Sequence, residues 1–217
     1  MVDRTVSSTA GNTVLLFGPQ ALSFDENDFY YIRSTVLNNE HHRWILDVIA
    51  ELPKCLCTIS RNYPKWSTEP GYQLLGDLKN WFNTGEISKT PFVLPNILLS
   101  PLVVIAQLTQ YAKYLELASF ETENGEDPHA SSKHNRETLG FCTGLLSAFA
   151  VSSSSNRENF QKYGAVSIRL AMLIGMVVDA QDASSEMGKS KSLATIWNSA
   201  RAGEDVTRIV RSFPEVS

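Results

Sequence analysis

The apolar residues of this chain fall into one short continuous run and several stretches with helical spacing. The run, Thr13–Phe17, stops at Gly18-Pro19 and is typical of a buried strand in a parallel sheet that is covered on both faces. Downstream, apolar residues recur every three or four positions, which predicts amphipathic helices. The expected helices cover Asp25–Leu37, Arg43–Glu51, Gly71–Phe82, Leu102–Leu117, a stretch from Thr143, Gln161–Val178 and, more weakly, Thr195–Phe213. Pro53 is expected to end the second of them.

Polar stretches between these elements indicate how the chain is organised. Residues 1–12 are polar and predict a disordered leader, followed by a folded region over 13–217. Residues 119–136 are polar and contain glycine and proline, which predicts a long surface loop. A short segment, Glu137–Phe141, follows this loop and leads into a helix. Few strands among many helices, joined as strand–turn–helix, indicate a helix-rich α/β core.

Composition and charge narrow the class of protein. The 217 residues are 43% hydrophobic and 19% charged, which excludes bulk disorder and suits one large domain or two small ones. A net charge of -4 argues against a general nucleic-acid binder. Three cysteines cannot form a closed set of disulfides, and no apolar stretch approaches the roughly 20 residues that span a bilayer. We therefore expect a cytoplasmic protein that binds neither nucleic acid nor membrane.

The motif Gly140-Phe141-Cys142-Thr143-Gly144 is the strongest chemical signal in the chain. A G-x-nucleophile-x-G pentapeptide between a strand and a helix forms a nucleophile elbow, in which the glycines allow a sharp turn. Cys142 would then lie at a helix N-terminus, where the partial positive charge favours the thiolate. The backbone N–H of Thr143 would point toward the oxyanion of a tetrahedral intermediate. The pentapeptide alone leaves open a buried structural cysteine in a glycine-rich turn.

The remaining reactive side chains give weaker signals. Gln20, in the loop after the first predicted strand, can supply a second oxyanion donor through its backbone N–H. Taken alone this segment is an ordinary turn, and its value comes from its pairing with the elbow. Cys55 and Cys57 form a C-x-C that would need histidine partners to complete a zinc site, and the histidines are too scattered to do so. The four histidines are His41, His42, His129 and His134. We interpret both cysteines as structural and expect no metal.

Several segments of the chain, the elbow among them, resemble a known family. They are similar to the starter-unit acyl-carrier-protein transacylase (SAT) domain at the N-terminus of fungal non-reducing polyketide synthases. The similar segments are Val14–Gln20, Leu94–Tyr111, Glu137–Val151 and Tyr163–Asp182. The family hallmark G-x-C-x-G is met by Gly140, Cys142 and Gly144. Within the family, the sequence looks closest to synthases of methylated orsellinic acids, such as those that begin meroterpenoid pathways.

The resemblance implies a fold, a reaction and a partner. The fold is an acyltransferase-type α/β-hydrolase-like core into which a small ferredoxin-like subdomain is inserted late. A starter acyl group passes from coenzyme A or another acyl carrier to the cysteine thiol, and then to the phosphopantetheine thiol of the synthase's acyl carrier protein domain. These thioesters are substrates, and no bound cofactor is implied. Met172 aligns with the position where related malonyl transferases hold a carboxylate with arginine, which predicts an uncharged acyl group.

The resemblance also implies a histidine that is missing at its expected place. In the family the general base lies well downstream of the motif, beyond the inserted subdomain, whereas no histidine occurs in residues 135–217. We therefore expect an incomplete domain that lacks the inserted subdomain and the C-terminal part. Either the chain is a truncated, catalytically defective domain or gene remnant, or it is a standalone accessory or docking protein of a synthase. A third interpretation, in which His129 or His134 folds back to Cys142, is disfavoured because both lie in a polar loop before the elbow.

Overall fold

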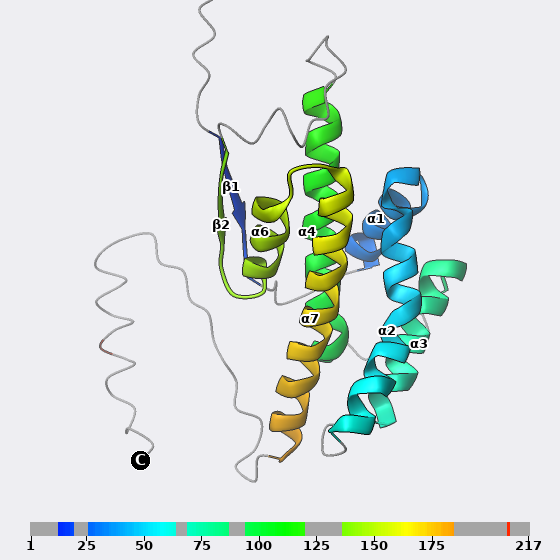
Figure 1. Ribbon diagram of the computed structural model, residues 1–217. Coiled ribbons are helices and arrows are strands. Elements are labelled where there is room, and N and C mark those ends of the chain that lie inside the picture. Colours follow the sequence, from blue (N-terminus) through cyan, green and yellow to red (C-terminus); the bar gives the residue numbers. More distant parts are fainter. Residues whose placement is uncertain are drawn as a thin grey trace, which may run out of the picture. The chain divides into compact units, whose positions relative to one another are not determined.

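The computed structural model describes residues 13–19, 26–63, 69–86, 94–119, 136–184 and 208. The chain divides into two compact units, 1–183 and 184–217, and nearly all described residues belong to the first. In chain order the elements are β1 (Thr13–Phe17), α1 (Glu26–Leu37), the 3-10 helix η1 (Glu40–His42), α2 (Arg43–Asn62), α3 (Glu69–Thr84), α4 (Asn96–Ser119), β2 (Arg136–Gly140), α6 (Gly144–Ser153) and α7 (Arg157–Ser184). Many helices with a small sheet are consistent with the predicted α/β class (Figure 1). The predicted leader, the loop over 119–136 and the helix over 195–213 lie largely outside the described residues.

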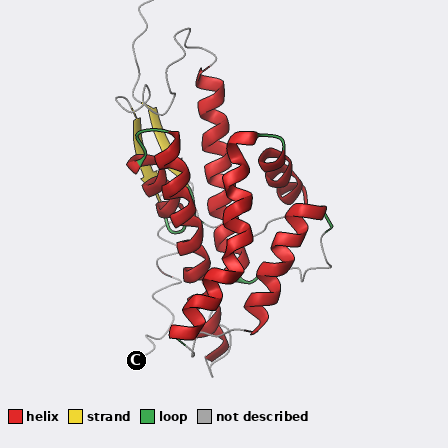
Figure 2. Ribbon diagram, turned by 45° about the vertical axis from the view of Figure 1, so that its right-hand side comes forward, coloured by secondary structure: helices red, strands yellow, loops and turns green. Residues whose placement is uncertain are grey.

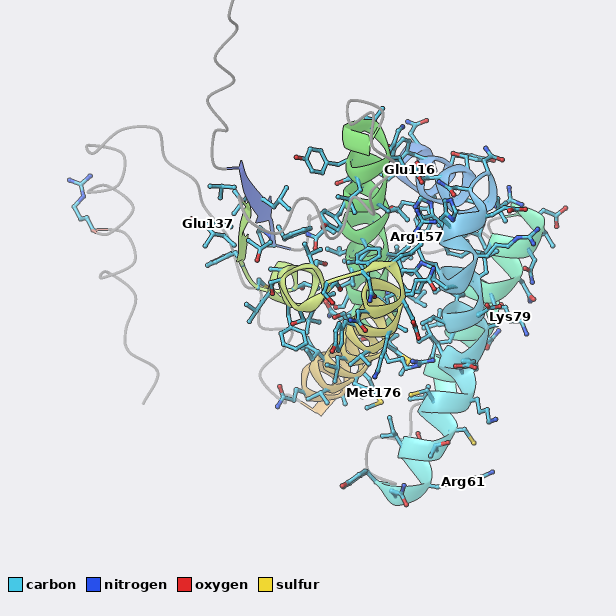
Figure 3. The ribbon with its side chains drawn as sticks, turned by 45° about the horizontal axis from the view of Figure 1, so that its top comes forward. Arg61, Lys79, Glu116, Glu137, Arg157 and Met176 are labelled. Carbon is cyan, nitrogen blue, oxygen red and sulfur yellow. The ribbon has the colours of Figure 1, made fainter. Side chains whose placement is uncertain are left out.

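The sheet in the described part of the chain consists of two parallel strands, β1 and β2, beside the helices (Figure 2). Thr13 is in register with Arg136 and Phe17 with Gly140, so the carboxyl ends of both strands meet at one edge. In Figure 3, Glu137 of the sheet and Lys79 of α3 lie on opposite sides of α4.

One face of the sheet is packed and the other is open. Phe17 is buried in the core and Leu15 packs against it, because side chains alternate along a strand. Val14 and Leu16 on the other face are exposed, as is Leu139 of β2. The prediction that both faces are covered is therefore wrong for the described residues.

Helix α4 lies at the centre of the core and links the sheet to the other helices. It contacts α1, α3 and α6. A chain of aromatic rings continues the packing, with ring centres 6.5 Å apart for Phe17 and Tyr111, 5.4 Å for Tyr111 and Phe160, and 6.0 Å for Phe160 and Trp44. These contacts join β1, α4, α7 and α2 in turn, so that the sheet is fixed relative to the helices that surround α4.

Helix α2 runs through Pro53 to Asn62, so the prediction that Pro53 ends it is wrong. A proline inside a helix costs roughly 3 kcal/mol, because its ring removes a hydrogen bond and crowds the preceding turn. Leu52 and Leu56 on either side of it are fully buried, and burying a leucine stabilises by roughly 1.5–3 kcal/mol. Tertiary packing of this face therefore outweighs the local preference of the proline.

Helix α4 begins at Asn96, upstream of the predicted start at Leu102, and contains Pro101. Its first N–H groups have an acceptor on α7. Asp179 Oδ1 accepts from the backbone N–H of Asn96 at 2.9 Å, and Oδ2 accepts from that of Ile97 at 2.8 Å. A carboxylate that satisfies the unpaired donors of a helix start stabilises that end, which allows the early start.

Helix α7 is longer than the predicted Gln161–Val178, and it corrects the expectation that no segment is long and apolar enough to cross a membrane. Among the described residues, Arg157–Gln181 is the one stretch that passes this test by length and composition. One side of the helix is buried in the core, through Phe160, Ile168, Ala171, Met172 and Met176. Core helices pass the same test, so the stretch is weak evidence for a membrane span.

Candidate functional site

The strand–turn–helix joint predicted at Gly140–Gly144 is present. Strand β2 ends at Gly140 and helix α6 begins at Gly144. The N–H of Gly144 donates to Phe141 O, and the N–H of Leu145 donates to Cys142 O, both at 3.0 Å. Such three-residue steps close a tight turn, so the chain passes from the strand into the helix with Cys142 at the bend.

Cys142 has a φ of 55°, and it is the only non-glycine residue with a positive φ in the described part of the chain. The left-handed conformation costs an L-amino acid roughly 1–2 kcal/mol, and such strain collects at functional sites. The side chain is exposed. Cys142 is therefore not a buried structural cysteine, and the turn presents its thiol to solvent.

The two motif glycines leave no room for a side chain. A Cβ at Gly140 would lie 2.6 Å from Gly144 O, and a Cβ at Gly144 would overlap the carbonyl oxygens of Phe17 and Gly18. These obstacles are backbone atoms, which cannot move aside as the end of a long side chain can. Helix α6 therefore packs directly on the ends of both strands, and this close approach requires glycine.

Thr143 stands at the N-cap position of α6, but its hydroxyl makes no capping hydrogen bond. Its Oγ1 lies 3.8 Å from Cys142 Sγ. Within the described residues, the backbone hydrogen bonds of the turn use the N–H groups of Phe141, Gly144, Leu145 and Leu146, and none uses that of Thr143. A helix start carries partial positive charge on such N–H groups, so this end of α6 attracts a negatively charged oxygen beside the thiol.

The loop that follows β1 lies against the elbow. The N–H of Phe141 donates to Phe17 O at 3.0 Å, and Gln107 Nε2 of α4 donates to Gly18 O at 2.9 Å. The start of the loop that was predicted to supply an oxyanion donor is thus next to Gly144. Gln20 itself lies outside the described residues.

Exposed apolar side chains flank the thiol in the sequence of the turn. Phe141 is 68% exposed and Leu145 is 61% exposed, on the two sides of Cys142. Met172 of α7, predicted to contact the acyl group, is fully buried in the core. Arg169, three positions before Met172 in the sequence, forms an ion pair with Glu51 of α2, so its positive charge is paired with that carboxylate. The predicted role of Met172 stays a prediction.

The described histidines lie on η1. Arg157 Nη1 lies 2.8 Å from His41 Nδ1, and His42 is buried with its Nδ1 3.1 Å from Thr35 O. His129 and His134 lie outside the described residues, so the interpretation in which one of them reaches Cys142 stays open.

Cys55 and Cys57 both lie on α2 as free thiols. Residues two positions apart on a helix do not face each other, which disfavours joint metal binding. Burial raises the pKa of the Cys55 thiol, the Arg169 charge lowers it and the Glu51 charge raises it. Within the described ranges, no group of three or more His, Cys, Asp or Glu residues could hold a metal ion.

Gln107 is a residue beside this site that the pattern of the sequence does not reveal. It lies in the helix predicted from its apolar stripe, where it is a polar side chain between buried Ile105 and Leu108. That polar interruption is the only signal in the sequence, and it does not say which group the amide binds.

Comparison with known proteins matches residues 75–216 to the family described as starter unit:ACP transacylase in aflatoxin biosynthesis. The chain is 53% identical over 215 residues to the non-reducing polyketide synthase pigA of Monascus ruber, covering 99% of this chain and 8% of that protein. It is 47% identical over 213 residues to the non-reducing polyketide synthase dbaI of Emericella nidulans, covering 98% and 8%. It is 44% identical over 221 residues to the 3-methylorcinaldehyde synthase tropA of Talaromyces stipitatus, covering 99% and 8%. The chain spans about 8% of the length of these curated relatives.

Proposed function

Because this chain belongs to the starter-unit acyl-carrier-protein transacylase family of fungal non-reducing polyketide synthases, we propose that it transfers a starter acyl group through a thioester on Cys142. The donor is an acyl-coenzyme A or another acyl carrier, and the acceptor is the phosphopantetheine thiol of the synthase's acyl carrier protein domain. The observation that carries the proposal is the exposed thiol at a left-handed turn whose flanking glycines pack on backbone. An α/β-hydrolase-like acyltransferase core is part of the same proposal, and a meroterpenoid product stays a prediction.

The first half-reaction forms an acyl-enzyme. Cys142 loses its thiol proton to a base in solution, and the thiolate attacks the carbonyl carbon of the donor thioester. A new C–S bond forms while the carbonyl π pair moves onto oxygen. When the oxygen returns that pair, the bond to the coenzyme A sulfur breaks, and the departing thiolate takes up a proton. The second half-reaction repeats these steps with the phosphopantetheine thiol as the attacking group, which restores the free thiol of Cys142.

The negative oxygen of each intermediate needs hydrogen-bond donors. The backbone N–H of Thr143 at the start of α6 is one, since it makes no backbone hydrogen bond in the described turn. The backbone N–H of Gln20, two positions after Gly18 in the sequence, is the second donor in this proposal. Donors fixed in place before the reaction stabilise the developing charge without further reorganisation.

The surroundings of the thiol favour an uncharged acyl group. Phe141 and Leu145 are exposed apolar neighbours of Cys142 in the sequence, and the family resemblance aligns Met172, which is buried in the core, with the position where related malonyl transferases carry arginine. A malonyl carboxylate bound against these apolar side chains would lose water without gaining a cation, which is costly. We therefore expect acetyl or hexanoyl thioesters to react faster than malonyl-coenzyme A.

Intact-protein mass spectrometry tests the proposal. Incubation with acetyl- or hexanoyl-coenzyme A should add one acyl mass, and peptide mapping should place it on Cys142. Addition of a phosphopantetheinylated carrier protein should then remove it. Cys57→Ala, which removes a free thiol elsewhere, should behave like the unchanged protein, whereas Cys142→Ala should take up no acyl group. An adduct that persists in Cys142→Ala would show that the proposed nucleophile is wrong.

A further inference from the structure

Thr143 carries a hydroxyl that its helix does not use. The threonines inside the described helices donate to the carbonyl oxygen four residues earlier, at 2.8–3.0 Å: Thr35 to Tyr31, Thr58 to Lys54, Thr84 to Asn80 and Thr109 to Ile105. The residue four positions before Thr143 is Leu139 of β2, which does not belong to a preceding helical turn. The hydroxyl of Thr143 is therefore left without the backbone acceptor that the other four have.

The capping role is closed to this hydroxyl as well. An N-cap residue normally has an extended backbone, which lets its side-chain oxygen accept from the second or third N–H of the helix. Thr143 has a helical φ of -56° and ψ of -31°, and it makes no capping bond. The N–H groups of Gly144, Leu145 and Leu146 instead donate to the carbonyl oxygens three residues earlier, at 3.0–3.1 Å. The backbone itself therefore satisfies the start of α6, and the helix does not need a threonine there.

The contact that the structure gives this hydroxyl is with the candidate nucleophile. Its Oγ1 lies 3.8 Å from Cys142 Sγ, and a thiol sulfur is only a weak hydrogen-bonding group. Cys142 is exposed and Thr143 is half-buried, so the two side chains meet where a substrate can arrive from solvent.

This separation suits the oxygen of an acyl group on the sulfur. In a thioester on Cys142 the acyl oxygen lies about 2.6 Å from the sulfur, because one C–S and one C–O bond join them. A hydrogen bond from a hydroxyl to a negative oxygen spans about 2.5–2.7 Å. These two lengths and the 3.8 Å between Oγ1 and Sγ can close a triangle, so the acyl oxygen is within hydrogen-bond reach of Thr143.

We propose that the Thr143 hydroxyl is a catalytic hydrogen-bond donor, which binds the negative oxygen of the tetrahedral intermediate at Cys142. The inference rests on the proposed function and deepens it, because it adds a side-chain donor to the backbone N–H of the same residue. The hydroxyl keeps its proton throughout. It donates a hydrogen bond while the carbonyl π pair resides on the acyl oxygen, and it is released when that pair returns and the C–S bond to the leaving thiolate breaks.

Two reactions of the same thiol separate this role from a structural one. Acylation by acetyl-coenzyme A passes through an oxyanion and needs its donors. Alkylation by iodoacetamide joins the Cys142 sulfur to a saturated carbon and expels iodide, so no oxyanion forms. A loss of folding or of thiol exposure would slow both reactions, whereas the loss of an oxyanion donor slows only the first.

The experiment compares Thr143→Val and Thr143→Ser with the control Thr58→Val, which removes a hydroxyl on α2. Rates of both reactions at Cys142 are followed by mass spectrometry at one pH. Thr143→Val keeps the shape of the side chain and removes the donor, so acylation at saturating acetyl-coenzyme A should fall by about a hundredfold while alkylation is unchanged. Thr143→Ser keeps the hydroxyl, so its acylation rate should stay within a few-fold of that of the unchanged protein. Thr58→Val should leave both rates as they are.

Each other result overturns the inference. Equal losses of acylation and alkylation in Thr143→Val would show a structural role, and an unchanged acylation rate would show none. If Thr143→Ser is acylated as slowly as Thr143→Val, the methyl group and not the hydroxyl matters. If the unchanged protein is alkylated at Cys142 but never acylated, the proposed function fails and the inference fails with it. If the unchanged protein is acylated and Thr143→Val matches it, only the role of the hydroxyl is refuted.

Discussion

Replacing Cys142 by glycine separates the conformation of the elbow from its chemistry. The residue has a φ of 55°, where an L-amino acid pays roughly 1–2 kcal/mol and glycine pays almost nothing. Glycine also has more conformational entropy in the unfolded chain, which lowers the stability of the folded state by roughly 0.5–1 kcal/mol and offsets part of the gain. The thiol is exposed, so its removal sacrifices little buried surface. We therefore expect the free energy of unfolding of Cys142→Gly to be about 0.5–1 kcal/mol higher than that of the unchanged protein, which makes the variant more stable.

Cys142→Ala is the matched control, because it removes the sulfur and keeps a Cβ at the strained φ. Thermal unfolding followed by circular dichroism measures the difference, and for a protein of this size 1 kcal/mol corresponds to roughly 2–4 °C. Cys142→Gly should therefore melt about 1–4 °C above Cys142→Ala, and neither variant should accept an acyl group. A melting temperature of Cys142→Gly at or below that of Cys142→Ala would refute the assignment of strain to this residue.

Two further predictions concern contacts away from the elbow. Asp179→Ala removes the acceptor for the first N–H groups of α4, so the free energy of unfolding in urea should fall by about 1–2 kcal/mol. The control Asp47→Ala, at an exposed position, should change this free energy little. Equal urea midpoints of unfolding for the two variants would contradict the capping role. Arg169→Met removes the positive charge that lowers the pKa of Cys55, so this pKa should rise and iodoacetamide should label Cys55 more slowly at mildly alkaline pH. Glu51→Gln should lower the same pKa and speed labelling, and identical rates for both variants would show that these charges do not act on Cys55.

The elbow could be predicted from the sequence because its determinants are local. Gly140 and Gly144 bracket Cys142 within five positions, and a strand-like run precedes them while an apolar helix follows. The positive φ of Cys142 and the lack of space at both glycines are what this spacing requires.

The residues that the sequence did not reveal act over long separations. Gln107 binds Gly18, and Asp179 caps α4 at Asn96, and neither pairing leaves a periodic signal. The continuation of α2 through Pro53 has the same origin, because burial of the neighbouring leucines comes from other helices. Local propensity predicted the elements well where packing agreed with it and failed where packing opposed it.

The parallel pairing of β1 with β2 also has a consequence for the order in which the protein forms. Register partners such as Phe17 and Gly140 are separated by roughly 120 residues, so a long loop has to close before the sheet exists. At a synthesis rate of roughly 5–20 residues per second, β1 is made about 6–25 s before its partner. Helices α1 to α4 are complete by then, whereas Cys142 enters its strained turn only when β2 docks beside β1. The growing chain therefore acquires its presented thiol only after α1 to α4 have been synthesised, at a stage when α6 and α7 have still to complete the core.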